Sequence, residues 1–398
     1  MTQLNPSFTE IKREYIFPII EKKLEELKAT VPSSEIINLG IGDIALPLAP
    51  SVKKGIEEGL QEMVLSSSLK GYGPSDGYFF LKEAIWLHEY KQRGITADEI
   101  FISDGINTDI ANIQELFPQN ILVGIPDPTY PVYMDSHVLA GRKKGVRLLP
   151  CIKQNGFQPQ IPEESLSLIY LCTPNNPTGV ALSKEELTLF VDYAHRNKCI
   201  LLIDAAYAAF VRSDDVPLSI YDIPGADEVA IEFKSFSKSA GFTGLRCSYT
   251  IIPKKLRGLV GEETISLHTL WKKRQSIKSN GVSYPIQRGA AAVFSDEGSK
   301  ETKDQVDYYL KQAHKLKTSL TGAGYSCFGG KDSPYIWCET PHGIGSWEFF
   351  DILLKKCHLI CIPGIGFGAN GEGFVRFSAF NTETTINRAV EKLKEMSF

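Results

Sequence analysis

Short, largely apolar runs alternate with amphipathic stretches through the middle of the chain. Four of these runs, each bounded by polar or turn residues, are ILVGI (121–125), LIYLC (168–172), CILLI (199–203) and EVAIEF (228–233). Runs without regular polar alternation are typical of strands that are buried on both faces of a parallel sheet. Strands that alternate with helices predict an α/β fold whose mostly parallel sheet is sandwiched by helices.

The stretch between the second and third runs predicts a helix with a defined start. Ser183 and Glu186 have the spacing of a capping box. From there the apolar residues recur at i, i+3, i+4 and i+7, as Leu187, Phe190, Val191 and Ala194. FIS (101–103) is a further short strand candidate, and a helical stretch follows it.

The pattern changes after residue 281. A long amphipathic helix, marked by Val306, Tyr309, Leu310 and Ala313, precedes the shorter strand-like pieces YIWCE, LICIP and FVRFSAF. These pieces predict a smaller α+β unit. We therefore expect a large domain at 45–280 and a small domain made of residues 1–44 and 281–398.

Composition narrows the class of protein. A length of 398 residues suits about two domains, and the net charge of −4 disfavours a nucleic-acid partner. The absence of a run of 18 apolar residues disfavours a membrane partner. Eight cysteines without a CxxC pair, several of them in apolar runs, indicate free thiols and a cytoplasmic location. The seven histidines are scattered, so no metal site is expected.

One glycine motif matches a dinucleotide-binding turn in its spacing, but the elements around it differ from those of such a turn. Gly366, Gly368 and Gly371 spell GxGxxG after the apolar piece LICIP. The piece that follows, FVRFSAF, reads as a strand, whereas a dinucleotide-binding turn must open a helix. We therefore do not expect a dinucleotide site.

Three polar motifs follow predicted strands. TPNNPTG (173–179) follows LIYLC, Asp204 and Tyr207 follow CILLI, and SFSKSAGFTGLR (235–246) follows EVAIEF. Taken singly, they can be a turn, a helix cap and a solvated lysine. Because ligands of open α/β sheets gather at the carboxyl ends of the strands, their shared position favours a ligand site.

Pyridoxal phosphate is the small molecule whose chemistry unites these groups. The amine of Lys238 can hold the cofactor aldehyde as a Schiff base. Asp204 can face the pyridine nitrogen and keep the ring protonated, so that the ring accepts electrons. Ser235, Ser237 and Arg246 supply the donors that a phosphate group needs.

The chain resembles the fold-type I, class I/II aminotransferases along nearly its whole length. PDPTYPVY, TPNNPTG, LIDAAY, SFSKSAGFTGLR and EGFVRFSAF carry the resemblance, in the order of the family. It implies a seven-stranded sheet in the large domain, the pyridoxal phosphate cofactor, and a ping-pong exchange between amino and oxo acids. The catalytic residues that it implies are Lys238, as Schiff-base lysine and proton carrier, Asp204 and Tyr207.

The family also implies a set of binding roles. Tyr207 and Asn176 would bond to the 3-oxygen of the cofactor, Tyr130 would stack on its ring, and Arg376 would clamp the substrate α-carboxylate. The remaining cofactor-binding residues that the resemblance implies are Tyr72, Gly105, Ile106, Asn107 and Asn280.

The likeness is greatest to the branch of the family that acts on LL-diaminopimelate and 2-oxoglutarate. REYIFPII and LGIGDIALPLAPSV resemble the opening of that branch, which implies that Tyr15 and Gly42 touch substrate. The resemblance to the family also implies a homodimer with sites at the interface, so Tyr72 and Asn280 would reach the site of the neighbouring chain. Asn107 stands where that branch has a lysine, and Ser75 where it has a glutamate. The substrate-binding residues implied in all are Tyr15, Gly42, Asn107, Tyr130, Asn176, Asn280 and Arg376.

Three alternatives stay open at this point. An aminotransferase for aspartate, aromatic or branched amino acids would carry the same cofactor motifs. A regulator that uses this fold as a sensor would need an added DNA-binding segment, for which we expect no room, since the fold begins near residue 10. An interaction protein without a ligand would not need Lys238, Asp204 and Arg376 together.

Overall fold

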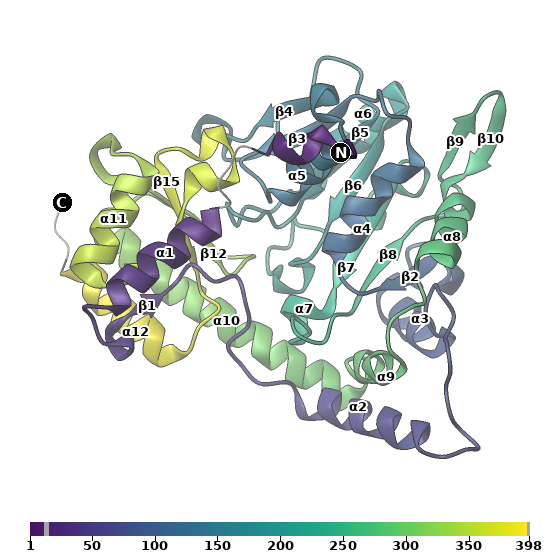
Figure 1. Cartoon of the computed structure of the whole chain (residues 1–398), viewed down its shortest axis with the longest axis horizontal. Helices are drawn as coiled ribbons and strands as arrows, with labels where there is room; N and C mark the ends of the chain where they lie inside the picture. The colour runs from purple at the N-terminus through teal and green to yellow at the C-terminus, as the bar shows by residue number, and fades with distance from the viewer. Residues whose placement is uncertain (12–15, 396–398) are drawn as a thin grey trace.

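A seven-stranded sheet forms the centre of the larger unit in the computed structural model, which describes residues 1–11 and 16–395 (Figure 1). Its spatial order is β2 (Ile100–Ser103), β8 (Ser248–Ile251), β7 (Ala230–Ser235), β6 (Ile200–Asp204), β5 (Leu168–Cys172), β3 (Val123–Asp127) and β4 (Val146–Pro150). Only β8 runs antiparallel to its neighbours. The expected α/β fold with a mostly parallel seven-stranded sheet is confirmed.

Helices cover both faces of this sheet, because successive residues of each strand point to opposite sides. One face buries Leu202 beneath α4 (Ile106–Ile113), α5 (Val132–Leu139) and α8 (Leu267–Lys278). The other face buries Leu201 and Ile203 beneath four further helices of the unit. These are α2 (Pro50–Met63), α3 (Phe79–Ile85), α6 (Lys184–Asn197) and α9 (Tyr284–Ala292). The start of α6 is the capping box expected at Ser183 and Glu186.

The second unit is built on a four-stranded antiparallel sheet. Its order is β11 (Cys327–Gly329), β12 (Tyr335–Glu339), β15 (Phe374–Ser378) and β14 (Ile362–Pro363). A short parallel pair, β1 (Ile37–Asn38) with β13 (Leu359–Ile360), lies beside it, so the predicted strand LICIP is divided between two sheets. α1 (Ile16–Lys28), α11 (Ser346–Cys357) and α12 (Glu383–Lys394) complete the α+β unit.

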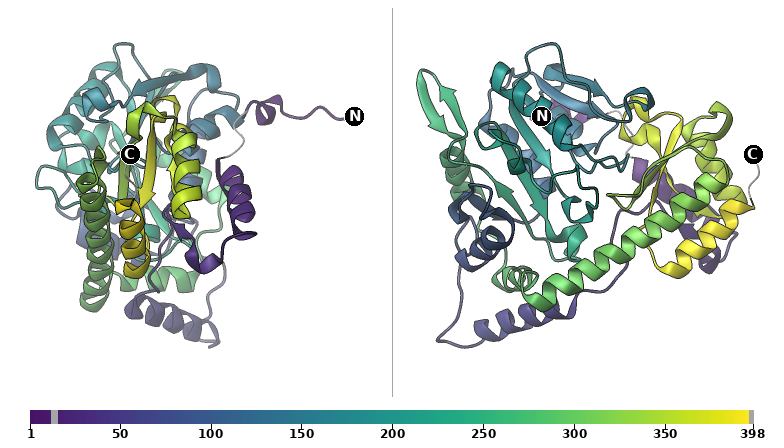
Figure 2. Two further views of the ribbon diagram at one scale, coloured as in Figure 1. Left: turned by 90° about the vertical axis from the view of Figure 1, so that its left-hand side faces the viewer. Right: turned by 180° about the vertical axis from the view of Figure 1, so that it is seen from behind.

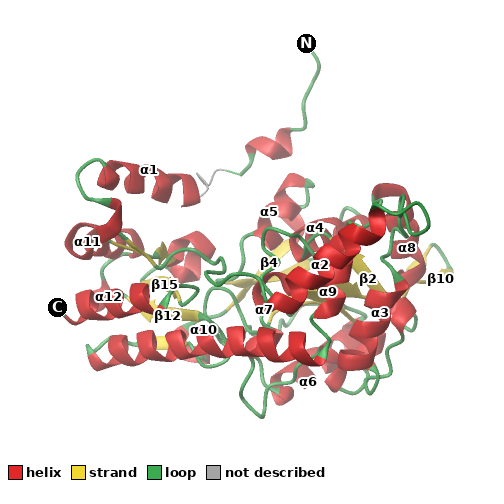
Figure 3. Cartoon of the chain, turned by 90° about the horizontal axis from the view of Figure 1, so that it is seen from below, coloured by secondary structure: helices red, strands yellow, loops and turns green. Residues whose placement is uncertain are grey.

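The helix α10 (Asp296–Gly322) spans the two units. One part of it contacts α2 and α7 (Phe236–Ser239), and another part contacts α12 and β12 (Figure 2). Seen from below, α10 runs along one side of the molecule from the smaller unit to the larger one (Figure 3). The domain boundaries that we expect near residues 45 and 281 stay a prediction.

Several smaller features bear on function. The glycines of the GxGxxG motif lie in two 3-10 turns before β15 and do not open a helix, as expected. All eight cysteines are free thiols. Within residues 1–11 and 16–395, no helix could span a membrane and no group of side chains has a metal-binding arrangement. A hairpin of β9 (Arg257–Val260) and β10 (Glu263–Ser266) projects from the larger unit (Figure 1).

Candidate active site

A cavity of about 390 Å³ lies at the carboxyl edge of the large sheet, against the smaller unit. Most of the side chains proposed from the sequence line it. They are Gly42, Ile106, Asn107, Tyr130, Asn176, Asp204, Tyr207, Ser235, Ser237, Lys238, Arg246 and Arg376. The chain therefore brings together at one point residues that are spread over more than 300 positions of sequence.

Asp204 is the last residue of β6 and is buried. Its Oδ2 accepts a hydrogen bond from Tyr133 Oη at 2.6 Å, and its Oδ1 accepts one from the Ala206 amide at 3.1 Å. Burial raises the pKa of the Asp204 carboxyl, and the two donors oppose that rise. A buried carboxylate favours a cationic partner in the cavity.

Lys238 lies in the short helix α7, directly after β7. Ser235 caps this helix, since its Oγ accepts a hydrogen bond from the Ser237 amide at 3.0 Å. The ammonium of Lys238 reaches across to the Gly42 carbonyl. Burial lowers the pKa of Lys238 to about 8; Asp43 opposes that shift, while Arg376 and Arg246 add to it. Lys238 is thus an amine that loses its proton more readily than a surface lysine.

Donors for an anion gather beside Lys238. Arg246 adopts the left-handed backbone conformation, with φ of 62°, and its guanidinium approaches the N-terminus of α4. The residue at that N-terminus is Gly105, where an added Cβ would lie 2.2 Å from Arg246 Nη2. Because Gly105 has no side chain, the Arg246 guanidinium can lie close to the N-terminus of α4. The guanidinium, this N-terminus and the hydroxyls of Ser235 and Ser237 therefore face one cavity. Such a set suits a phosphate group.

Arg376 comes from β15 and is 3% exposed. Its Nη1 donates to Asn176 Oδ1 and its Nη2 to the Gly40 carbonyl, both at 2.7 Å, and its Nε has no partner among the described residues. The guanidinium carbon lies 4.4 Å from the ring centroid of Tyr335. No ion pair of the described residues includes Arg376. A buried guanidinium without an anion is a site for a carboxylate.

Tyrosines join the two ends of the cavity. The Tyr207 and Tyr335 hydroxyls lie 2.8 Å apart and connect the loop after β6 to β12 of the smaller unit. Tyr130 Oη donates to Asn107 Oδ1 at 3.2 Å. These contacts fix hydroxyl groups along the cavity wall between Asp204 and Arg376.

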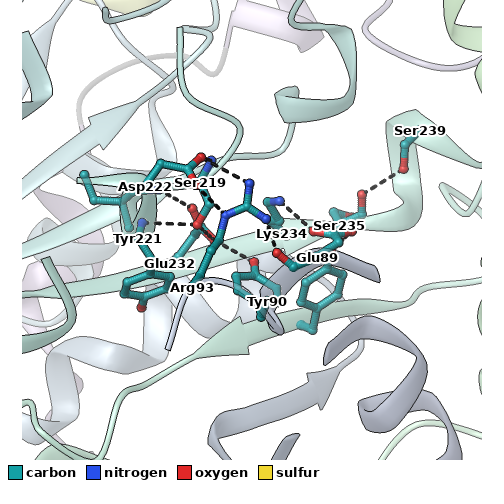
Figure 4. Close-up of polar contacts among 12 residues, drawn as sticks. Glu89, Tyr90, Arg93, Ser219, Tyr221, Asp222, Glu232, Lys234, Ser235 and Ser239 are labelled. Atoms are coloured by element: carbon teal, nitrogen blue, oxygen red, sulfur yellow. Dashed lines mark hydrogen bonds and ion pairs between the residues drawn. The ribbon is translucent and has the colours of Figure 1, made fainter. Parts of the chain in front are cut away.

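A network of polar side chains, most of them buried, contacts β7 (Figure 4). Glu89, from the π-helical turn at Trp86–Tyr90, accepts hydrogen bonds from Lys234 Nζ at 2.6 Å and from Tyr249 Oη at 2.7 Å. Lys234 immediately precedes Ser235, so the network anchors the strand end that carries the turn with Lys238. Further along the strand, Glu232 accepts from Tyr90, Ser219 and the Ile220 amide.

Three of the proposed residues lie elsewhere. Gly105 stands behind Arg246 and does not line the cavity, while Tyr72 is 91% exposed and Asn280 is also exposed. Both exposed side chains lie outside the cavity of their own chain, and a role in a neighbouring chain stays a prediction. Tyr15 lies outside the described residues.

Sequence reasoning missed other residues that line the cavity or bond to its lining side chains. Tyr133 bonds to Asp204, and Tyr335 bonds to Tyr207. Tyr133 could have been found, because it lies three residues after Tyr130 at the start of a helix, where such residues share a face. Tyr335 comes from the other unit, and no local signal places it here. Asp43 also lines the cavity.

Comparisons with known proteins agree with this geometry. The sequence profile of the family "Aminotransferase class I and II" matches residues 34–393. The LL-diaminopimelate aminotransferase of Desulforapulum autotrophicum is 46% identical over 406 aligned residues, which cover 99% of each chain. The enzyme of the same name from Prochlorococcus marinus is 43% identical over the full length of both chains.

A solved structure gives the same answer. The structure of L,L-diaminopimelate aminotransferase from Chlamydomonas reinhardtii superimposes with a TM-score of 0.93 at 39% identity, covering 99% of this chain and 98% of that one. Sequence, fold and cavity therefore agree, and the chain belongs to the class I and II aminotransferase family.

Proposed function

We propose that this aminotransferase exchanges an amino group between LL-diaminopimelate and 2-oxoglutarate. The observation that carries the proposal is the convergence of Lys238, Asp204 and Arg376 on one cavity. Two full-length relatives at 46% and 43% identity with this named activity support the choice of substrate. The products are tetrahydrodipicolinate, after ring closure of the oxo acid, and glutamate. In the cell the reaction runs toward diaminopimelate, for lysine and peptidoglycan.

The residues of the cavity fit pyridoxal phosphate, the cofactor of class I and II aminotransferases. Ser235, Ser237 and Arg246 would bind its phosphate, and Asp204 would pair with the protonated ring nitrogen. Tyr130 would cover the ring, while Asn176 and Tyr207 would bond to its 3-oxygen. When bound, the cofactor supplies an electron-withdrawing ring that stabilises negative charge at the substrate α-carbon.

Lys238 would carry the proton in this reaction. Its Nζ removes a proton from the substrate α-carbon, which requires the neutral amine. Burial lowers the pKa of Lys238 to about 8, so a useful fraction of the amine is neutral near pH 7.5.

Arg376 would orient the substrate. Its guanidinium is rigidly held by Asn176 and the Gly40 carbonyl, and it presents an unused N–H in a buried place. A bidentate contact to the α-carboxylate would set the α-carbon near Lys238. The unsatisfied buried charge that the free enzyme carries would be neutralised when substrate binds.

A coupled assay tests the proposal. The purified protein is loaded with pyridoxal phosphate and supplied with 2-oxoglutarate and one amino donor, and glutamate formation is measured. We expect turnover with LL-diaminopimelate and far less with aspartate or phenylalanine. Turnover of aspartate or phenylalanine, with none of LL-diaminopimelate, would overturn the choice of substrate and leave the aminotransferase assignment in place.

We also propose that the enzyme works as a cytoplasmic homodimer. Tyr72 and Asn280 are exposed and lie outside their own cavity, as suits side chains that complete the site of a second copy. Sedimentation of the purified protein tests this, and Tyr72→Ala should lower turnover without altering the fold of its own chain.

A further inference from the structure

Tyr335 is a buried phenol of the smaller unit that lines the cavity. It is the first residue of β12 and lies opposite Ser378 of β15, so Arg376 is its diagonal neighbour on the same face of the sheet. The Arg376 guanidinium carbon lies 4.4 Å from the centroid of the Tyr335 ring, within the range of a cation–π contact. The strand pairing thus brings the ring to Arg376 and leaves the hydroxyl to reach Tyr207.

The room for this hydroxyl comes from Gly42. A Cβ added at Gly42 would lie 2.6 Å from Tyr335 Oη, which is closer than two such atoms can approach. The carbonyl of the same glycine accepts a hydrogen bond from Lys238. A side chain at position 42 would therefore displace the Tyr335 hydroxyl from its contact with Tyr207.

The hydroxyls of Tyr207 and Tyr335 have two protons and one hydrogen bond between them. Their oxygens lie 2.8 Å apart, and no other group of the described chain bonds to either hydroxyl. When one hydroxyl donates to the other, the second proton is left without an acceptor from the described chain, although both side chains are buried. A buried donor without an acceptor is costly. The pair is therefore completed by an acceptor on a bound ligand.

The surroundings of the two phenols indicate which of them donates to the other. Tyr207 lies three residues after Asp204, on the side of the cavity where the cofactor ring is expected. Burial raises the pKa of Tyr207 well above its usual range. Burial also raises the pKa of Tyr335, but there the Arg376 guanidinium is the main influence that opposes the rise. The more acidic phenol is the better donor, which favours donation from Tyr335 to Tyr207.

We propose that Tyr335 is a positioning residue for Tyr207: its hydroxyl donates to the Tyr207 oxygen and thereby directs the Tyr207 proton to the 3-oxygen of the cofactor. This inference rests on the proposed function, in which Tyr207 binds that oxygen. The hydrogen bond that Tyr207 accepts also makes its own O–H a stronger donor, since hydrogen bonds in a chain polarise one another. Tyr335 thus acts on the cofactor through Tyr207.

A pH titration of the visible absorbance of the loaded enzyme, without substrate, tests this. The bound cofactor loses a proton that its 3-oxygen shares, and the absorbance changes with that loss. A donor to the 3-oxygen stabilises the anionic form and lowers the midpoint of the change. Tyr207→Phe should therefore raise the midpoint by about one pH unit or more. Tyr335→Phe, which keeps the ring beside Arg376, should raise it by about 0.2–0.5 pH units.

The direction of the shift separates the two orders of donation. If Tyr207 donated to Tyr335, loss of the Tyr335 hydroxyl would free the Tyr207 proton for the cofactor, and the midpoint would fall. A lower or an unchanged midpoint in Tyr335→Phe would overturn the inference. Placing 3-fluorotyrosine at position 335 is a second test that keeps the hydroxyl. This more acidic phenol donates more strongly, so the midpoint should move below that of the wild type, and a rise would contradict the proposal.

A double variant tests whether Tyr335 acts through Tyr207. In the enzyme that already carries Tyr207→Phe, adding Tyr335→Phe should cause no further shift of the midpoint. A further shift as large as that of Tyr335→Phe alone would refute the action through Tyr207.

Tyr193→Phe is the matched control. It removes a buried hydroxyl that bonds to the backbone of Glu164 and Leu166 and does not line the cavity, so the midpoint should stay unchanged. A shift as large as that of Tyr335→Phe would show a general effect of losing a buried hydroxyl and would overturn the inference. None of these titrations uses LL-diaminopimelate, so a wrong choice of substrate would leave the inference standing. An unchanged midpoint in Tyr207→Phe would refute both the inference and the proposed place of Tyr207.

Discussion

Replacing Tyr133 by Phe removes one hydrogen bond from Asp204 and should weaken the hold on the cofactor in a pH-dependent way. The Tyr133 hydroxyl donates to Asp204 Oδ2 at 2.6 Å, and both residues are buried. A hydrogen bond to a charged group contributes about 1.5–3 kcal/mol, and each pKa unit corresponds to about 1.4 kcal/mol. The pKa of Asp204, already raised by burial, should therefore rise by about one to two further units.

The direction of the pH effect on cofactor affinity follows from the ionic form of Asp204 that the cofactor needs. Asp204 pairs with a protonated ring nitrogen only as a carboxylate, so affinity falls as pH drops below the pKa of Asp204. In Tyr133→Phe that fall should begin at a pH about one to two units higher than in the wild type. The measurement is the dissociation constant of pyridoxal phosphate from the apoenzyme, titrated by absorbance between about pH 5 and 9.

Tyr170→Phe is the matched control. Tyr170 stacks on Tyr133 with ring centroids 5.0 Å apart and is equally buried, but its hydroxyl bonds to His137 and not to Asp204. Its loss should leave the pH dependence of cofactor binding unchanged. If Tyr133→Phe and the wild type gave superimposable curves, the hydrogen bond would have no influence on Asp204 and the reasoning would be wrong.

Three further predictions concern the turn with Lys238 and its supports. The Lys238 amine in the apoenzyme should titrate near pH 8, measured by NMR after reductive ¹³C-methylation, with Lys238→Ala identifying the signal; a midpoint near that of a surface lysine would contradict it. Gly105→Ala should displace Arg246, because the new Cβ would lie 2.2 Å from its guanidinium. The affinity for the cofactor, measured by equilibrium dialysis, should then fall about tenfold or more. Unchanged affinity would count against Arg246 as a phosphate ligand. Glu89→Gln should destabilise the fold by about 3 kcal/mol in urea unfolding, since it leaves Lys234 buried without its anion; a loss below about 0.5 kcal/mol would mean that the pair is solvated.

Local patterns were sufficient where one segment determines its own structure. LIYLC is β5 without a shift, and the capping box begins α6 at the expected residue. Asp204 ends a strand of a mostly parallel sheet, and Asn176 and Lys238 each follow one, so topology alone places them at a common edge. These are the parts of the site that a sequence can predict from first principles.

Contacts between distant segments could not be read in this way. Tyr335 meets Tyr207 across 128 positions of sequence, and Arg376 meets Asn176 across 200. Their pairing depends on how the smaller unit packs against the larger one, which no local periodicity encodes. The division of LICIP between two sheets is a similar case, because strand pairing is decided by partners from both ends of the chain.

The carboxylate-binding end of the cavity belongs to neither unit by itself. Arg376 comes from β15, Asn176 from the turn after β5, and Gly40 from the segment that leads into α2. If the gene were divided near residue 280 and the halves produced separately, the arginine would have lost both of its anchors. Activity would then return only on reassembly, which makes this enzyme suited to a split-protein reporter whose signal depends on the two halves meeting.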